Sequence, residues 1–205
     1  MRFYLSLIRY YVVNMLPGVL GAVLLFGCLY PWRRRRLHDR GLGSTALREG
    51  ALLLFWMFCG GMAVLTLTPW GFHWVTLLRY GIISDQGSFF ALGDLNLIPF
   101  QSFDLGAPTR YTLFNILGNL IMFLPFGFFS TLLWRGYTWK RSLVTGAAIT
   151  GFVECWQLLV GRAFDIDDLI LNTLGVLTGF WLLRLLEYFA PAAVRRFRVR
   201  KLREK

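Results

Sequence analysis

The stretch GRAFDIDDLILNTLGVLTGF, residues 161–180, begins with one arginine and three aspartates and then becomes a nearly unbroken apolar helix pattern. The apolar pattern starts at Leu169 and continues to Phe189, which is close to the 20 or so residues that a helix needs to cross a bilayer. Charged groups are costly inside a bilayer and usually mark functional positions there. The stretch therefore predicts a membrane-spanning helix whose first turns carry acidic groups with a function.

The composition of the whole chain supports a membrane protein. Of its 205 residues, 56% are hydrophobic, 17% are aromatic and only 16% are charged. A soluble domain has roughly 45–50% apolar and about 25% charged residues. The length predicts one domain, so we expect residues 1–205 to form a single membrane domain.

Five segments are apolar and long enough to span a membrane as helices. They are residues 11–30, 51–69, 112–133, 142–160 and 169–189. The predicted fold class is therefore an all-α, polytopic transmembrane bundle of about five spans. Residues 1–10 either lie in the membrane interface or extend the first span. Pro125 predicts a kink or an interruption of the third span.

The positive charge is concentrated beside the predicted spans. The net charge is +11, and the basic runs are RRRR at 33–36, RGYTWKR at 135–141 and RRFRVRKLREK at 195–205. Such runs act as topology signals and contacts for anionic lipids, which argues against nucleic acid as the partner. They predict a cytoplasmic C-terminal tail, residues 191–205, and an N-terminus on the outer side.

This orientation places a long loop between the second and third spans, residues 70–111, on the outer side. Loops of this length are often functional. The loop contains NLIPFQSF, residues 96–103, which is apolar and aromatic for an aqueous segment. We expect it to dip into the interface or to fold back over the bundle; a short amphipathic connector is the alternative.

Polar side chains recur at helical spacing in the outer halves of the last three predicted spans. Residues three or four apart share one face of a helix, so each span presents a polar stripe. The stripes comprise Asn115 and Asn119 in the third span, Glu154 and Gln157 in the fourth, and Asp165, Asp168 and Asn172 in the fifth. Asp167 is rotated away from its stripe, which predicts a solvated or helix-capping charge. Together the stripes can line one cavity open to the outer leaflet, or they can simply hydrogen-bond the helices together.

Four motifs resemble the VanZ-like family in their order and spacing. They are NLIPF at 96–100, NILGNLIMFLPFGF at 115–128, ECWQ at 154–157 and RAFDIDDLILNTLGVLTG at 162–179. The resemblance covers a core of about residues 96–179. By position, the polar motif residues of the family fall on Asn96, Asn115, Asn119, Glu154, Gln157, Arg162, Asp165, Asp168 and Asn172.

The VanZ-like family consists of small bacterial integral membrane proteins whose founding member is associated with teicoplanin resistance. The resemblance implies a multi-pass protein of the bacterial cytoplasmic membrane with a role at the cell envelope. It assigns neither an enzymatic activity, a cofactor nor an oligomeric state, so the mechanism has to come from the residues.

Three functions remain open from the sequence. In the first, an outward polar site binds a lipid-linked cell-wall intermediate, a lipoglycopeptide or another amphiphile, with Arg162 meeting a phosphate or carboxylate and the segment around Phe100 forming an apolar lid. In the second, Glu154 is the acid or base of an enzyme acting on a lipid-linked envelope substrate, and Asp165 and Asp168 could hold Mg²⁺. In the third, Glu154 is the proton site of a transporter.

Overall fold

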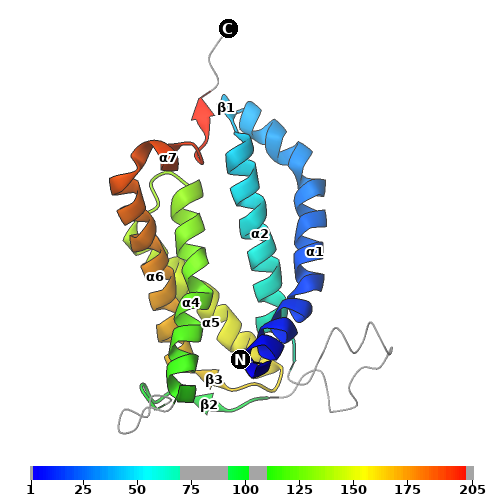
Figure 1. Cartoon of the computed structure of the whole chain (residues 1–205), viewed down its shortest axis with the longest axis vertical. Coiled ribbons are helices and arrows are strands. Elements are labelled where there is room, and N and C mark those ends of the chain that lie inside the picture. The colour runs from blue at the N-terminus through cyan, green and yellow to red at the C-terminus, as the bar shows by residue number, and fades with distance from the viewer. Residues whose placement is uncertain (1, 70–91, 102–109, 202–205) are drawn as a thin grey trace.

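The computed structural model describes residues 2–69, 92–101 and 110–201 (Figure 1). Most of the long loop predicted between the second and third spans therefore lies outside the described residues. The long helices of the described part are α1 (Arg2–His38), α2 (Ala46–Leu67), α4 (Arg110–Leu133), α5 (Trp139–Leu159) and α6 (Ile166–Phe189). Each is long and apolar enough to cross a membrane. The predicted all-α bundle of five spans is confirmed.

The predicted spans and the helices agree within a few residues, except at α1. This helix starts at Arg2 and ends at His38, so the first residues extend the helix instead of forming a separate segment. Helix α4 continues through Pro125, so of the predicted kink or interruption, the interruption does not occur. A proline is tolerated inside a membrane helix because neighbouring groups can satisfy the freed backbone carbonyl.

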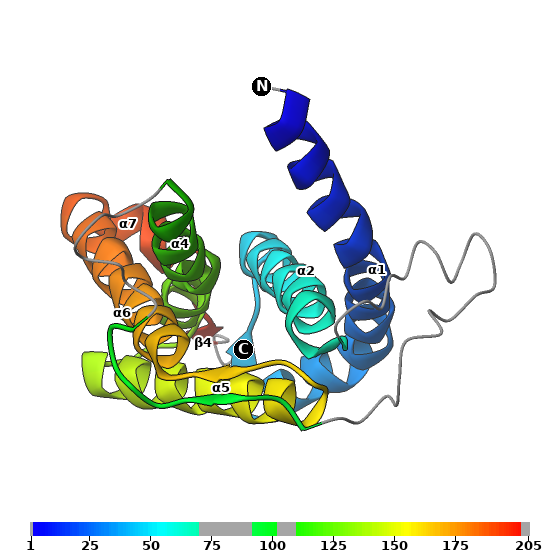
Figure 2. The ribbon, with the colours of Figure 1, turned by 90° about the horizontal axis from the view of Figure 1, so that it is seen from below.

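The helices form two pairs, α1 with α2 and α4 with α6, and α5 crosses beside both pairs (Figures 1 and 2). Glycines allow α4 and α6 to approach closely. A Cβ atom added at Gly175 would overlap the carbonyl of Leu120, and one at Gly179 would overlap the carbonyl of Leu124. Such close packing is typical of small residues at membrane helix interfaces.

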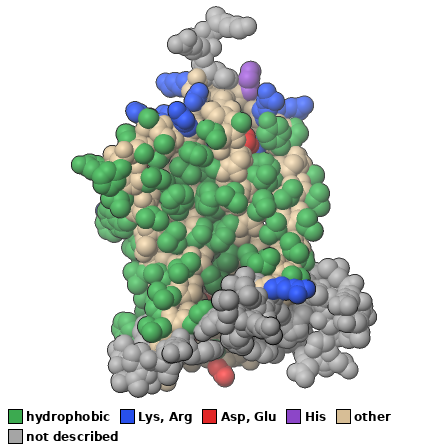
Figure 3. All heavy atoms as spheres, viewed as in Figure 1, with side chains coloured by type: hydrophobic (Ala, Val, Ile, Leu, Met, Phe, Trp, Pro, Cys, Tyr) green, Lys and Arg blue, Asp and Glu red, His purple; other side chains and the backbone are tan. Residues whose placement is uncertain are grey.

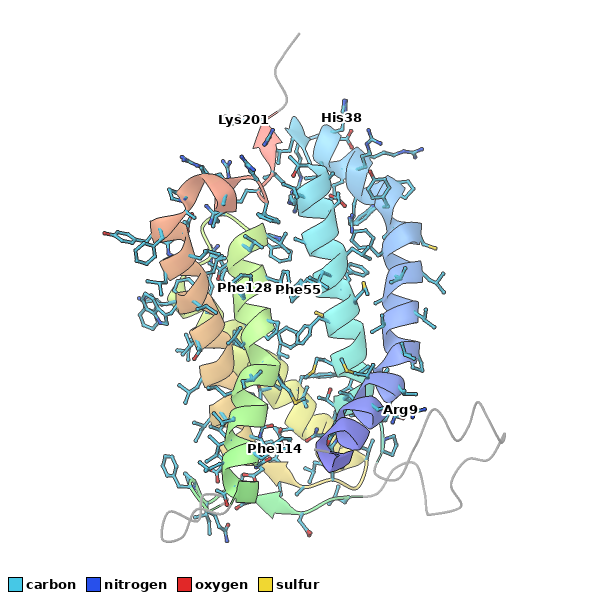
Figure 4. All side chains as sticks on the ribbon, viewed as in Figure 1. Arg9, His38, Phe55, Phe114, Phe128 and Lys201 are labelled. Carbon is cyan, nitrogen blue, oxygen red and sulfur yellow. The ribbon has the colours of Figure 1, made fainter. Side chains whose placement is uncertain are left out.

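Aromatic side chains join α2 to α4. The rings of Phe55 and Phe129 stack with centroids 5.4 Å apart, and those of Phe58 and Phe126 meet edge to face at 5.2 Å. Figure 4 shows Phe55 on the side of α2 that faces α4. Lipid tails are as apolar as these side chains, so the hydrophobic effect does not drive helices together inside a bilayer. Helix association there depends on van der Waals packing contacts such as these.

Short elements close the two ends of the bundle. At one end, β1 (Leu42–Gly43) pairs in antiparallel fashion with β4 (Arg200–Lys201), and α7 (Pro191–Arg195) follows α6. At the other end, β2 (Leu95–Asn96) pairs in parallel with β3 (Phe164–Asp165). We call these the basic end and the polar end, respectively, after the charged residues that gather at each.

Charge is distributed along the bundle as the sequence predicts. Figure 3 shows a broad apolar band in the middle of the molecule and most of the Lys and Arg side chains of this face at the basic end. Figure 4 shows His38 and Lys201 at that end, and Arg9 and Phe114 at the polar end. A cytoplasmic basic end remains a prediction from this charge bias.

Candidate functional site

Side chains from three helices and one loop meet at the polar end. Glu154 lies in the last turns of α5, and its side chain is almost completely buried, with 1% of the residue exposed. It lies in electrostatic range of Asp168 in the first turn of α6 and of Arg162 in the loop between α5 and β3. From α4, the amide nitrogen Nδ2 of Asn119 donates a hydrogen bond to Oδ1 of Asp168. The structure thus brings together residues that the sequence assigned to separate polar stripes.

Asp165 lies just before α6 and caps the start of that helix. Its backbone is extended, and its side chain accepts a hydrogen bond of 2.9 Å from the backbone N–H of Asp167. Its own backbone N–H donates to Oε2 of Glu154 at 3.0 Å. The sequence predicted that Asp165 shares a helical stripe with Asp168. This prediction is wrong, because the helix begins only at Ile166. Its observed side-chain bond is the usual role of an aspartate at an N-cap.

Asp167 is fully buried, so the expectation of a solvated or capping charge is wrong. Its Oδ1 accepts a hydrogen bond of 2.6 Å from the backbone N–H of Phe100. Phe100 has a φ of +67°, in the left-handed region that residues other than glycine seldom adopt. Asn96 is the register partner of Asp165 in the β2–β3 pair. The described part of the outer loop consequently folds back on the start of α6.

Residues at the end of α5 and just beyond it contact the C-terminal turn of α2. Gln157 Nε2 donates to the carbonyl of Thr66 at 3.2 Å, and Trp156 Nε1 donates to the carbonyl of Leu67 at 2.7 Å. Arg162 Nη1 approaches the carbonyls of Leu65 and Thr66, each at 3.4 Å. The last four carbonyls of a helix lack partners within the helix, and a cation is favoured at that end. These side chains therefore attach α2 to the polar cluster.

Arg162 is the cation of the cluster. Burial lowers the pKa of its guanidinium, and the nearby carboxylates of Glu154 and then Asp168 oppose this effect. No direct ion pair joins Arg162 to either carboxylate, both of which lie in the described part of the chain. An arginine offers five N–H donors, and the contacts of Arg162 with the carbonyls of α2 use only Nη1. The guanidinium thus keeps donors with which it can bind an anionic group.

A second layer of polar atoms is buried in α5 and α6. Asn172 Oδ1, Thr150 Oγ1 and Thr173 Oγ1 have no hydrogen-bond partner among the described residues. The polar stripes predicted from the sequence include Asn172 but neither threonine. Thr150 is four residues before Glu154 and so shares its helix face, which is a signal that the sequence contained. Buried polar atoms are normally hydrogen-bonded, so this layer can extend the site inward.

Two predicted features are not part of this cluster. Asn115 is exposed near the start of α4, one turn from Asn119, and among the described residues the hydrogen bond from α4 to Asp168 comes from Asn119 instead. A metal site at Asp165 and Asp168 gains no support, because the described residues contain no group of three or more His, Cys, Asp or Glu that could hold a metal ion. The residues brought together are Asn119, Glu154, Arg162, Asp165 and Asp168, with Gln157 turned to α2 and Asn172 in the second layer.

An apolar five-helix bundle with a partly buried polar cluster at one end defines a multi-pass integral membrane protein. Within that class, the model of the VanZ/LLP1 family matches residues 53–187, which is more than half of the chain. The chain therefore belongs to the VanZ/LLP1 family. The match includes the motif-bearing core at about residues 96–179 and extends into α2. No curated protein and no solved structure matches the chain.

Proposed function

We propose that the polar end binds the head group of a lipid-linked or amphiphilic molecule of the bacterial cell envelope. The observation that carries this proposal is the position of Arg162, which lies in electrostatic range of Glu154 and Asp168 without a direct ion pair to either. An anionic group of the ligand would bind the guanidinium, and hydroxyl or amide donors would bind the carboxylates. The resemblance to the VanZ-like family suggests that this binding contributes to teicoplanin resistance.

The segment next to the cluster supports an amphiphilic ligand. Leu97, Ile98 and Phe100 are each more than half exposed, and the Asp167 carboxylate holds the Phe100 backbone beside the start of α6. Exposed apolar side chains next to a partly buried charged cluster can contact acyl chains while the head group enters the cluster. A ligand with a polar head and an apolar tail matches the charged cluster with its head and the exposed apolar side chains with its tail.

The hydrogen bonds divide the predicted site residues into two groups. Glu154 and Asp165 bind backbone N–H groups, and Gln157 binds a backbone carbonyl. Their side chains therefore maintain the shape of the site. Asn119 and Asp168 bind each other through side chains, and a ligand could replace or extend that bond at little cost to the fold. We expect these two residues and Arg162 to contact the ligand.

A matched pair of asparagines in α4 tests the proposal. The purified protein in lipid nanodiscs is titrated with teicoplanin, vancomycin and lipid II, and binding is measured by calorimetry. Asn119→Ala should weaken binding of the recognised molecule about tenfold, which corresponds to the loss of a hydrogen bond to a charged group. Asn115→Ala, in the same helix but exposed, should leave binding unchanged. Equal effects of the two substitutions, or no binding of any of the three molecules, would contradict the proposal.

Catalysis at the same site is a second candidate function, favoured by the electrostatic interaction of a buried Glu154 with Asp168. Two acids in different surroundings can divide the roles of acid and base. The protein is incubated with lipid II and with total envelope lipid, and products are sought by mass spectrometry. Turnover that disappears in Glu154→Gln would establish an enzyme, whereas binding without any product would support the binding function alone.

A further inference from the structure

A cavity of about 560 Å³ lies at the basic end of the bundle, far from the polar cluster. It is formed by the last turns of α1, the loop that contains β1, and the first turn of α2. A neighbouring hollow of about 360 Å³ shares three of its lining residues, Tyr30, Arg34 and His38. None of the residues assigned to the polar cluster takes part in either hollow.

The charge of the cavity is predominantly positive. Arg33 and Arg34 line it, and the acid in its lining is Glu49. Arg33 Nη2 pairs with Glu49, but Arg33 Nη1 is buried without a hydrogen-bond partner among the described residues. Arg34 is exposed and forms no ion pair with any described residue. Arg34 thus offers the cavity a guanidinium group that forms no ion pair with the described residues.

The remaining lining is suited to an amphiphile. Tyr30, Leu37 and Leu42 contribute apolar surface beside the arginines, and Ser44 adds a hydroxyl group. Trp32, in the same part of α1, is more than half exposed, and tryptophan and tyrosine are enriched where membrane meets water. The cavity therefore combines cationic donors with apolar walls at the level expected of lipid head groups.

We propose that this cavity binds the phosphate head group of an anionic phospholipid in the leaflet next to the basic end. Guanidinium groups bind phosphate oxygens through paired N–H donors, and Arg34 borders both hollows. Glycerol and the first acyl carbons would lie against Tyr30, Leu37 and Leu42. The site is independent of the function proposed for the polar end, because it shares no residue with it.

Native mass spectrometry of the full chain, purified in detergent and stripped of lipid, tests this site. Phosphatidylglycerol and phosphatidylcholine with identical acyl chains are added separately, and glycerol 3-phosphate serves as the soluble competitor. We expect phosphatidylglycerol to bind more tightly than phosphatidylcholine and to resist displacement by an equal concentration of glycerol 3-phosphate. Arg34→Gln should reduce its affinity about five- to tenfold, the effect of one basic residue near an anionic surface.

The matched control is Arg36→Gln. It removes the same charge from the same helix, but Arg36 lies 5.1 Å from the ring of Trp32 and lines neither hollow. The control should bind phosphatidylglycerol like the unchanged protein. Equal losses in both variants would show a diffuse charge effect, and full displacement by glycerol 3-phosphate would show a site for free phosphate; either result would overturn the proposal. Both arginines are exposed, so size-exclusion profiles should confirm that the variants remain folded.

Discussion

Glu49 at the basic end and Glu154 at the polar end are both glutamates near a helix terminus, but their surroundings differ. Glu49 pairs with the side chains of Arg33 and Arg48, and its side chain is 19% exposed. Glu154 is 1% exposed, and one of its oxygens accepts a backbone N–H. At the basic end, the glutamate forms ion pairs with arginine side chains and remains in partial contact with water. At the polar end, acids hold the backbone, so their loss should change the conformation of the site.

The same difference extends to the neighbouring acids. Asp165 and Asp167 at the polar end accept backbone N–H groups of a helix start and of the outer loop. Glu187 toward the basic end pairs with the guanidinium groups of Arg184 and Arg198. Ion pairs that keep contact with water contribute little to stability, whereas an unsatisfied buried donor is costly. The two ends should therefore respond differently to matched substitutions.

The largest effect is expected from Glu154→Ala compared with Glu49→Ala. Loss of the Glu154 carboxylate leaves the half-buried Asp165 N–H without its acceptor, which destabilises the fold by about 1–3 kcal/mol. Glu49→Ala removes ion pairs to the half-buried Arg33 and the buried Arg48, but Arg48 keeps its bond to Ser44, so stability should change by about 0–1 kcal/mol. Unfolding of the purified variants in detergent, followed by circular dichroism, measures the difference. Glu154→Gln, which keeps an acceptor oxygen, should recover most of the loss. Equal destabilisation by the two alanine substitutions would remove the contrast between the ends.

Arg162→Gln compared with Arg141→Gln should have the next largest effect. Arg162 contacts the last carbonyls of α2, so its replacement should accelerate amide hydrogen exchange in that turn about tenfold. Arg141 Nη1 bonds to the carbonyl of Gly136 at 3.2 Å, in a turn near the basic end. Its replacement should leave exchange in α2 unchanged. Normal protection of α2 in Arg162→Gln would show that Trp156 and Gln157 attach the helix without it.

Asp167→Ala should release the described part of the outer loop with a smaller, local effect. The Phe100 N–H loses its carboxylate acceptor, so its exchange rate should rise about fivefold, corresponding to about 1 kcal/mol. Amide exchange measured by mass spectrometry on peptides covering residues 95–101 reports this change. Asp167→Asn keeps an acceptor oxygen and is the control. Unchanged exchange in the alanine variant would mean that the β2–β3 pair alone positions the loop.

The smallest effect is expected from Glu187→Gln. This substitution removes the ion pairs with Arg184 and Arg198 and should lower the free energy of unfolding by less than about 1 kcal/mol. The loss should shrink at high salt, because ions screen charges near the surface. Unfolding at low and high salt concentrations measures both quantities. A large, salt-independent loss would indicate that the basic end also depends on buried charge.

Sequence patterns were sufficient for the fold, because membrane spans are defined by length and hydropathy and both can be counted along the chain. Helical spacing also placed Asn119, Glu154 and Asp168 on polar stripes of three helices, which could meet in one site or only hydrogen-bond the helices together. Sequence patterns failed at Asp165 and Asp167. The partners of those carboxylates are backbone N–H groups, which every residue carries, and the start of α6 could not be located within one residue. The contact between Arg162 and α2 could not be predicted either, because its partners are backbone carbonyls, which every residue also carries.

The β1–β4 pair has a consequence for how the protein is made. It joins the loop after α1 to residues 200–201, and Thr45 Oγ1 donates to the carbonyl of Arg196 at 2.9 Å. During synthesis the first two helices enter the membrane long before these partners leave the ribosome. Until residues 200–201 have been translated, β1 in the loop between α1 and α2 has no β4 to pair with. The β1–β4 pair can therefore form only after α1, α2, α4, α5 and α6 have all been synthesised.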